Sequence, residues 1–351
     1  MKKILFFSVS ALLFGLFAMV ANADDLISVR NSDSEPVKLI FDTDMGNDVD
    51  DALALAIIHA MVDRGKCEFL GLTLTKSNLN AARYCKAFNI QYGHPDIPIG
   101  LVKDGKEPGD GRYVGRVLEI KKADGTPAFP VPDGWQPEDS VQLLRKLLAK
   151  APDNSVVIAQ VGFSTNLARL LDTPSDDISP LTGKELAEKK VRLVSAMAGA
   201  FTFPNNRFEN HKEYNVVVDI PSAQKVFHTW PGEIVFSGFE VGVEIQFPGI
   251  ALVADCNKRE HEILKESYRF YRDGLEGKNQ CTWDLTSVLF VVRPEAWRNY
   301  YTLSPKGNVT VLDDSRTRFA EDPNGTRRAF LCSPEQNKRI QEAFINLCTE
   351  R

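Results

Sequence analysis

The sequence predicts an α/β protein of the Rossmann-like kind, with an open, mostly parallel central sheet flanked by helices. Short apolar runs with the length of buried strands alternate along the chain with segments whose leucines and isoleucines recur at helical spacing. Polar motifs follow the ends of these runs, where open α/β sheets bind their ligands. No Gly/Ser-rich or Pro-rich linker divides the chain, so we expect residues 24–351 to form a single domain.

The expected elements follow from the apolar runs in order. Strands are predicted over 37–41, 69–75, 156–160, 191–196 and 233–237. Helices are predicted from Asp50 onward and over 141–150, 262–273 and 340–348. The polar stretches 103–112 and 172–190 are expected to be surface excursions.

The strongest chemical signal is a run of acids between the first strand and the helix that follows it: Asp42, Asp44, Asp48, Asp50 and Asp51. A fold tolerates so many close carboxylates only if some are protonated or a hard cation lies among them. Calcium takes roughly six to eight oxygen ligands and magnesium about six, and carboxylates supply them. A plainer interpretation is a helix capped by Asp48 or Asp50, but capping needs only one or two of these acids.

Two known loop types fit this run only in part. An EF-hand loop requires glycine at its sixth position and glutamate at its twelfth, and counting from Asp42 these places hold Asn47 and Leu53. Phosphatases of the haloacid dehalogenase type carry Asp-x-Asp after an apolar strand, which Asp42 and Asp44 satisfy, but they expect threonine or valine where Gly46 stands. A magnesium-dependent phosphatase is therefore kept as a minor alternative.

The run more closely resembles the metal-binding signature of the nucleoside hydrolases, Asp-x-Asp-x-Gly followed by a short spacer and Asp-Asp-Ala. The spacer here, Asn47-Asp48-Val49, is longer than in the shortest family members. Further motifs similar to those of the family follow in order, each near the end of a predicted strand: Lys76-Ser77-Asn78, the turn 162–168, Met197-Ala198-Gly199, Glu213-Tyr214-Asn215 and Thr282-Trp283-Asp284. The resemblance covers roughly residues 37–295.

This resemblance implies a calcium-dependent enzyme that hydrolyses the N-glycosidic bond of ribonucleosides to ribose and free base. The family pattern assigns four calcium ligands, with the first also acting as the base: Asp44, Asp51, the backbone carbonyl of Val161, and Asp284. It assigns the substrate contacts to Asp50, Asn78, Met197, Glu213, Asn215 and Trp283. Carboxylates in this arrangement would also stabilise the positive charge that develops on the ribose.

One position departs from the inosine- and uridine-preferring members. There the residue before the final aspartate is a histidine thought to protonate the departing base, whereas this chain has Trp283. An indole is not a useful proton donor, but it could stack on a purine or only pack against the sheet edge. His211, two residues before Glu213 in a loop that could cover the pocket, is a candidate for the missing acid.

A different class of function stays open because of this departure. A site that binds ribosides without cleaving them would make the chain a non-catalytic nucleoside- or sugar-binding protein with the same calcium ligands. Retention of Asp44 argues against this interpretation.

Base preference in the family is set by loops, and the loop 201–212 of this chain matches no family signature. Trp283 alone therefore indicates only a slight preference for purines. Family members are commonly dimers or tetramers, so a homo-oligomer is a further expectation.

The beginning of the chain resembles a secretory signal peptide. Met1-Lys2-Lys3 is followed by an apolar stretch over 4–20 and by the small residues Ala21-Asn22-Ala23. We therefore expect residues 1–23 to be removed after Ala23 and the mature chain to be periplasmic or secreted, although the stretch is long enough to leave an uncleaved anchor as an alternative. After cleavage no membrane association is expected.

Removal of residues 1–23 takes away two lysines and no acid, so the formal charge moves from −5 to −7. This acidic balance repels polynucleotides, and no nucleic-acid partner is expected. The expected partner is a small nucleoside, which carries no charge on its sugar.

The six cysteines contain no Cys-x-x-Cys pair, which argues against zinc or a redox motif. Cys332 and Cys348 are the candidate disulfide, with buried free thiols as the alternative.

Overall fold

The computed structural model describes residues 35–201, 207–256, 261–273, 278–293, 300–331 and 333–349. The predicted signal peptide and Cys332 lie outside these residues, while Cys348 is a buried free thiol. No helix in the described ranges combines the length and apolarity needed to cross a membrane.

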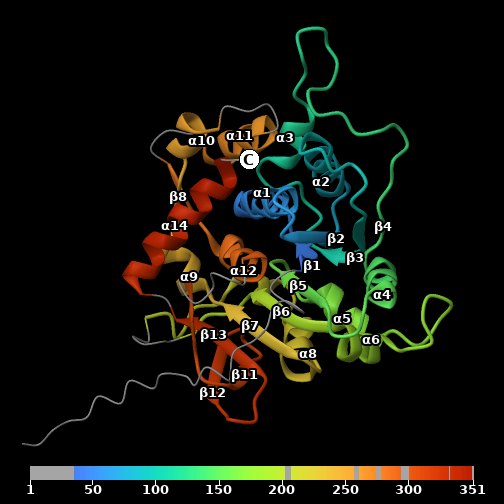
Figure 1. The fold of residues 1–351 in the computed structure, drawn as a ribbon, viewed down its shortest axis with the longest axis vertical. Coiled ribbons are helices and arrows are strands. Elements are labelled where there is room, and N and C mark those ends of the chain that lie inside the picture. The colour runs from blue at the N-terminus through green and yellow to red at the C-terminus, as the bar shows by residue number, and fades with distance from the viewer. Residues whose placement is uncertain are drawn as a thin grey trace, which may run out of the picture.

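An eleven-stranded sheet forms the centre of the molecule, with the spatial order β12-β11-β13-β7-β6-β5-β1-β2-β3-β4 and with β10 beside β13 (Figure 1). The strands that pair in parallel are β1 (Val37–Thr43), β2 (Cys67–Lys76), β3 (Ile99–Lys106), β4 (Glu138–Asp139), β5 (Val156–Gln160), β6 (Val191–Met197), β7 (Glu233–Ser237) and β13 (Arg327–Leu331). In this sheet β10 (Thr302–Leu303) and β11 (Gly307–Val311) pair antiparallel with β13, and β12 (Thr317–Glu321) pairs antiparallel with β11. A small separate sheet is formed by the antiparallel strands β8 (Gln246–Pro248) and β9 (Asn279–Cys281). The predicted mostly parallel α/β fold is confirmed.

Helices cover both faces of the sheet (Figure 1). One face packs against α1 (Asp50–Asp63), α2 (Leu79–Gln91), α11 (Glu262–Arg272), α12 (Trp283–Val292) and α14 (Pro334–Thr349). The other packs against α4 (Ser140–Lys150), α5 (Thr165–Asp172), α6 (Gly183–Lys190) and α8 (Ile220–Thr229). Short helices fill the connections: α3 (Val114–Leu118), α7 (Tyr214–Val218), α9 (Phe239–Glu244) and α10 (Ile250–Ala254).

Alternation along the central strands explains the two cores. In β1, Leu39 and Phe41 enter the core beneath α1, whereas Ile40 enters the core beneath α4 and α5. Successive side chains of a strand point to opposite faces, so a strand covered on both sides must be apolar at nearly every position. This is why β1 and β5 were recognisable as continuous apolar runs.

Two polar stretches expected to be surface excursions contain regular structure. Residues 172–190 include α6, which begins with a capping box between Thr182 and Glu185 and buries Leu186 and Ala187. Residues 103–112 begin within β3, which runs to Lys106. The prediction failed for α6 because its two buried apolar residues are outnumbered by charged ones, and two residues set no helical period.

The order of the strands places a crevice at the centre of the sheet. After β1 the chain builds β2, β3 and β4 on one side and then returns to build β5, β6 and β7 on the other. The connections that leave the carboxyl ends of β1 and β5 therefore run in opposite directions along the sheet. Open α/β sheets bind ligands at such a switch point, where the order of the strands reverses.

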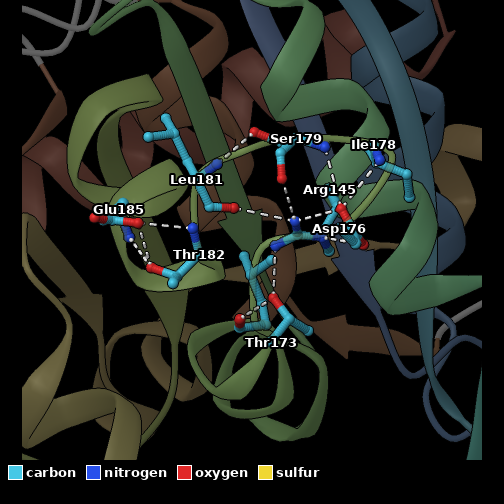
Figure 2. A network of polar contacts seen from close by, with 9 residues as sticks. Arg145, Thr173, Asp176, Ile178, Ser179, Leu181, Thr182 and Glu185 are labelled. Atoms are coloured by element: carbon cyan, nitrogen blue, oxygen red, sulfur yellow. Dashed lines mark hydrogen bonds and ion pairs between the residues drawn. The ribbon is translucent and has the colours of Figure 1, made fainter.

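A buried arginine fixes the segment between α5 and α6 (Figure 2). Arg145 on α4 donates to both carboxylate oxygens of Asp176, at 2.6 and 2.9 Å, and to the Thr173 hydroxyl at 2.8 Å. It also donates to the backbone carbonyls of Leu181 at 3.1 Å and Ser179 at 3.4 Å. Because the Arg145 side chain is only 1% exposed, these contacts satisfy donors that water cannot reach.

We expect Arg145→Met to lower the free energy of unfolding by about 3 kcal/mol, because buried carbonyls and a hydroxyl lose their donor while the aliphatic volume is kept. Urea denaturation followed by circular dichroism measures the change. The next residue, Lys146, makes an exposed ion pair with Glu138. Lys146→Met removes this pair alone and should change the urea midpoint far less. Equal effects of the two variants would contradict a structural role for the Arg145 network.

Candidate active site

A single cavity at this switch point gathers every predicted site residue except Asn78. The predicted residues that line it are Asp44, Asp50, Asp51, Val161, Met197, Glu213, Asn215, Trp283 and Asp284. Others in its lining had no predicted role or only a tentative one: Asn47, Asp48, His211, Lys212, Tyr214 and Phe239. The lining comes from the segments that follow β1 and β5, from the end of β6, and from α1, α7, α9, α12 and the residues directly before α7.

Three carboxylates form the tightest group in the cavity. Oxygen atoms of Asp50, Asp51 and Asp284 lie within 4.8 Å of one another, and all three side chains are almost fully buried. Two contacts orient them: the Asp284 backbone N–H donates to Asp50 at 3.1 Å, and the Thr43 hydroxyl donates to Asp51. All three begin helices, whose amino ends favour negative charge.

Burial and mutual repulsion make this group a poor place for bare carboxylates. Burial, reinforced by neighbouring aspartates, raises the pKa of Asp50, Asp51 and Asp284 well above its ordinary value. Such a group either retains protons or binds a cation, and an all-oxygen donor set suits calcium or magnesium rather than zinc. The residues present therefore fit a hard divalent cation.

Asp44 stands beside this group and has its own support. The side-chain amide of Asn47 donates to Asp44 at 2.7 Å, and the Lys76 ammonium donates to the carbonyl oxygen of the same amide. Lys76 is 1% exposed, so a buried cation lies behind the acidic cavity. Burial raises the pKa of Asp44 to about 7, against the opposing effects of Asn47 and Lys76. Asp44 is thus held in one orientation through Asn47 by Lys76.

The carbonyl of Val161 is carried into the cavity by the turn after β5. The Val161 N–H donates to the Asp42 carbonyl at 2.7 Å, which joins this turn to the end of β1. The following residue must be glycine, because a Cβ on Gly162 would lie 2.6 Å from the backbone nitrogen of Asp44. The Val161 carbonyl accepts from the Asn215 side chain at 2.7 Å and has a second lone pair for another partner.

Glu213 forms the opposite polar wall. Its carboxylate accepts from the backbone N–H groups of Gly199, Asn215 and Val216 at 2.8 to 3.2 Å, so it also caps α7. Burial raises its pKa to about 7 despite these three donors. Met197 belongs to the same lining, and its thioether accepts from the Asn215 side-chain amide at 3.4 Å.

Aromatic rings form the remaining wall. The Trp283 indole N–H donates to the Phe239 carbonyl at 3.1 Å, and the two rings stack with centroids 5.6 Å apart. His211 stacks in turn on Phe239, with centroids 3.6 Å apart and an interplanar angle of 23°. A Cβ on Gly242 would lie 2.2 Å from the Trp283 ring, so α9 approaches this ring as only glycine allows. Trp283 both packs on α9 and faces the cavity.

Asp48 is bound from a distant helix rather than capping its own. The Tyr271 hydroxyl on α11 donates to Asp48, and the Arg112 guanidinium lies 5.2 Å from the centre of the Tyr271 ring. Residue Val49 is the N-cap of α1, and no side chain caps this helix. The plainer interpretation, in which Asp48 or Asp50 caps α1, is therefore not borne out, because both carboxylates have partners elsewhere.

Asn78 does not line the cavity. Its side chain accepts from the Ala81 N–H at 2.7 Å, which caps α2, and donates to the Pro108 carbonyl and to Asp110. An asparagine directly before a helix is a common N-cap, and that signal was present in the sequence. Asn47 could not be identified in this way, since its contact with Asp44 depends on Lys76 from another strand.

Comparison with solved structures gives the same architecture. The fold is similar to that of a plant nucleoside hydrolase, the PpNRh1 enzyme, with a TM-score of 0.66, 20% identity, and 90% of this chain and 100% of that chain covered. A purine-preferring ribonucleoside hydrolase from Gardnerella vaginalis gives a TM-score of 0.66 and 20% identity over 89% of this chain and 98% of that one. The type III effector XopQ, solved with adenosine diphosphate ribose, gives 0.63 and 15% identity over 92% and 96%.

Because these sequence identities are low, the similar structures establish the fold alone. The search of curated protein sequences found no match to the chain. The sequence itself carries the family: residues 39–337 match the family described as inosine-uridine preferring nucleoside hydrolase. That range contains the acidic junction after β1, the turn after β5 and the start of α12, all of which meet in one cavity. The chain belongs to the inosine-uridine preferring nucleoside hydrolase family.

Proposed function

We propose that this protein hydrolyses ribonucleosides to ribose and free base with the help of calcium. The observation that carries the proposal is the convergence of Asp44, Asp51, Asp284 and the Val161 carbonyl on one buried cavity with the polar wall at Glu213. The nucleoside hydrolases with the same fold support it, and so does the match to the family.

Calcium would be held by Asp51, Asp284, the Val161 carbonyl and Asp44, and Asp50 lies close enough to share in the coordination. When bound, calcium would supply a fixed charge that orients a water molecule and the ribose hydroxyls. The grouping of Asp50 with Asp51 and Asp284 differs from the family-based expectation, in which Asp50 contacts only the sugar. Both roles are compatible for a carboxylate, which has two oxygens.

The protein side chains would divide the remaining work. Asp44 accepts a proton from the attacking water, and the Lys76–Asn47 contact keeps its carboxylate aimed into the cavity. Glu213 and Asn215 hold ribose hydroxyls and so fix the position of the anomeric carbon. The buried carboxylates stabilise the positive charge that develops on the sugar as the bond to the base breaks.

A binding function without cleavage is the second candidate. It is favoured by Trp283, whose N–H is committed to Phe239 and cannot protonate a base. The type III effector protein XopQ, solved in complex with adenosine diphosphate ribose, has a similar fold. We also propose export to the periplasm or beyond, which is supported only by the character of residues 1–23.

Purified residues 24–351 should release reducing sugar from at least one of inosine, adenosine, guanosine, uridine and cytidine when calcium is present, and a chelator should stop the release. A reducing-sugar assay and chromatography of the free base measure both products. Calcium-dependent nucleoside binding by calorimetry with no ribose released would instead establish the binding function.

Asp51→Asn should weaken calcium binding at least tenfold and lower turnover in parallel, because it removes one of three clustered carboxylates while keeping side-chain size. Isothermal titration with calcium measures the first effect independently of activity. Asp63→Asn, at the opposite end of the same helix, is the matched control and should leave both unchanged. Full activity of Asp51→Asn in a chelated sample would refute the metal assignment.

In the presence of a chelator, the free energy of unfolding of the protein should fall as pH rises from about 5 to 8. The pKa of Asp44 is near 7 in the folded state and near 3.8 otherwise, and Asp50, Asp51 and Asp284 shift in the same direction. The folded state therefore binds more protons than the unfolded chain in this window, and unfolding becomes easier as those protons are lost. The midpoint temperature of thermal unfolding, measured with calcium and with chelator, should differ by an amount that grows with pH. A difference that stays constant with pH would contradict this.

A further inference from the structure

Cleavage of a nucleoside leaves an electron pair on the departing base, and the cavity needs a group that can supply a proton there. In the described part of the chain, the cavity lining has six residues outside the carboxylates whose side chains carry an N–H or O–H donor: Asn47, His211, Lys212, Tyr214, Asn215 and Trp283. The Asn47 amide donates to Asp44, and the Asn215 amide donates to the carbonyls of Val161 and Met197. The Trp283 N–H is already donated to Phe239. Burial raises the pKa of Tyr214, which makes its hydroxyl a weaker acid than usual.

His211 has the geometry and the chemistry for this task. Its ring stacks on Phe239, which stacks on Trp283, so the imidazole continues the aromatic wall against which a planar base would lie. Its backbone is fixed by a hydrogen bond from the His211 N–H to the Phe208 carbonyl at 2.9 Å. Among the described residues, neither ring nitrogen of His211 has a hydrogen-bond partner, so both are available to a ligand. Imidazole is also the side chain that exchanges protons most readily near neutral pH.

We propose that His211 is the general acid that protonates the departing base, an assignment that rests on the proposed hydrolase function. As the bond from the anomeric carbon to the base nitrogen breaks, its electron pair stays with the base, and the His211 imidazolium gives its proton to a ring nitrogen of that base. The water oxygen forms the new bond to the anomeric carbon and loses its proton to Asp44. Ribose and neutral base leave, and His211 regains its proton from solvent.

His211 would take the role of the histidine that other family members carry before the final aspartate and that this chain lacks. Family members with histidine before the final aspartate place their acid on the helix that carries Asp284 here, and in this chain that place is filled by Trp283. His211 instead comes from the segment leading into α7, beside Glu213. Burial lowers the pKa of His211, which makes its protonated form a stronger acid while reducing the fraction protonated at neutral pH.

The test compares two substrates whose leaving groups differ in their need for a proton. Inosine must release a purine that leaves poorly as an anion, whereas 4-nitrophenyl riboside releases a phenolate that is stable without protonation. His211→Phe keeps the ring that stacks on Phe239 but has no proton to give. We expect its turnover number to fall about 100-fold or more on inosine and to stay within about threefold on the nitrophenyl riboside.

The matched control is His228→Phe, an exposed histidine on α8 that should leave both turnover numbers unchanged. Equal losses of His211→Phe on both substrates would make His211 structural and overturn the proposal, as would an unchanged rate on inosine. Wild-type protein that cleaves the nitrophenyl riboside but no nucleoside would overturn the assignment of His211 and the choice of nucleosides as substrates, while leaving riboside hydrolysis in this cavity. Wild-type protein that cleaves neither would overturn the hydrolase proposal itself, and the assignment of His211 with it.

Discussion

Repulsion between buried carboxylates is the constraint around which this molecule is arranged. Asp50, Asp51 and Asp284 are brought within 4.8 Å of one another with almost no access to water. Nothing in the apolar cores requires this arrangement, and a fold selected for stability alone would separate these groups. The surroundings reduce the cost locally, through helix amino ends, the Thr43 hydroxyl and the buried Lys76 ammonium. The residual repulsion is what a bound cation would relieve, as the proposed calcium site requires.

The cavity has two walls with different physical chemistry. The carboxylates and Glu213 form a polar wall that can order the hydroxyls of a sugar, and Trp283, Phe239 and His211 form a wall of flat, weakly polar surface. A nucleoside has the same division, with a hydroxylated ring joined to a planar heterocycle. The bond between the two halves would lie where the walls meet, close to Asp44. Complementarity of this kind favours one orientation of the ligand over its reverse.

Prediction from the sequence was best where function and local structure share the same residues. The acids after β1 follow an apolar strand and precede a helical period, so their position at a sheet edge could be inferred without any knowledge of distant contacts. Asn78 caps α2 and lies outside the cavity lining, and a sequence motif does not distinguish a helix cap from a sugar contact, so its contact with ribose stays a prediction. Asn47 and Lys76 were missed because their pairing depends on the register between β1 and β2. The stack of His211 on Phe239 joins the segment before α7 to the first residue of α9, and no periodicity encodes the relative position of the two.

The carboxylate group is also closed by a contact between Asp50 and Asp284, whose positions are 234 residues apart. Asp50 and Asp51 are made early in synthesis, whereas Asp284 arrives only after the strands from β2 to β7 have been translated. A nascent or truncated chain that ends before α12 carries only two of the three clustered acids, and its Asp50 lacks the backbone N–H that Asp284 donates. If a cation binds this group as proposed, its binding would depend on completion of the fold and would stabilise finished molecules over incomplete ones.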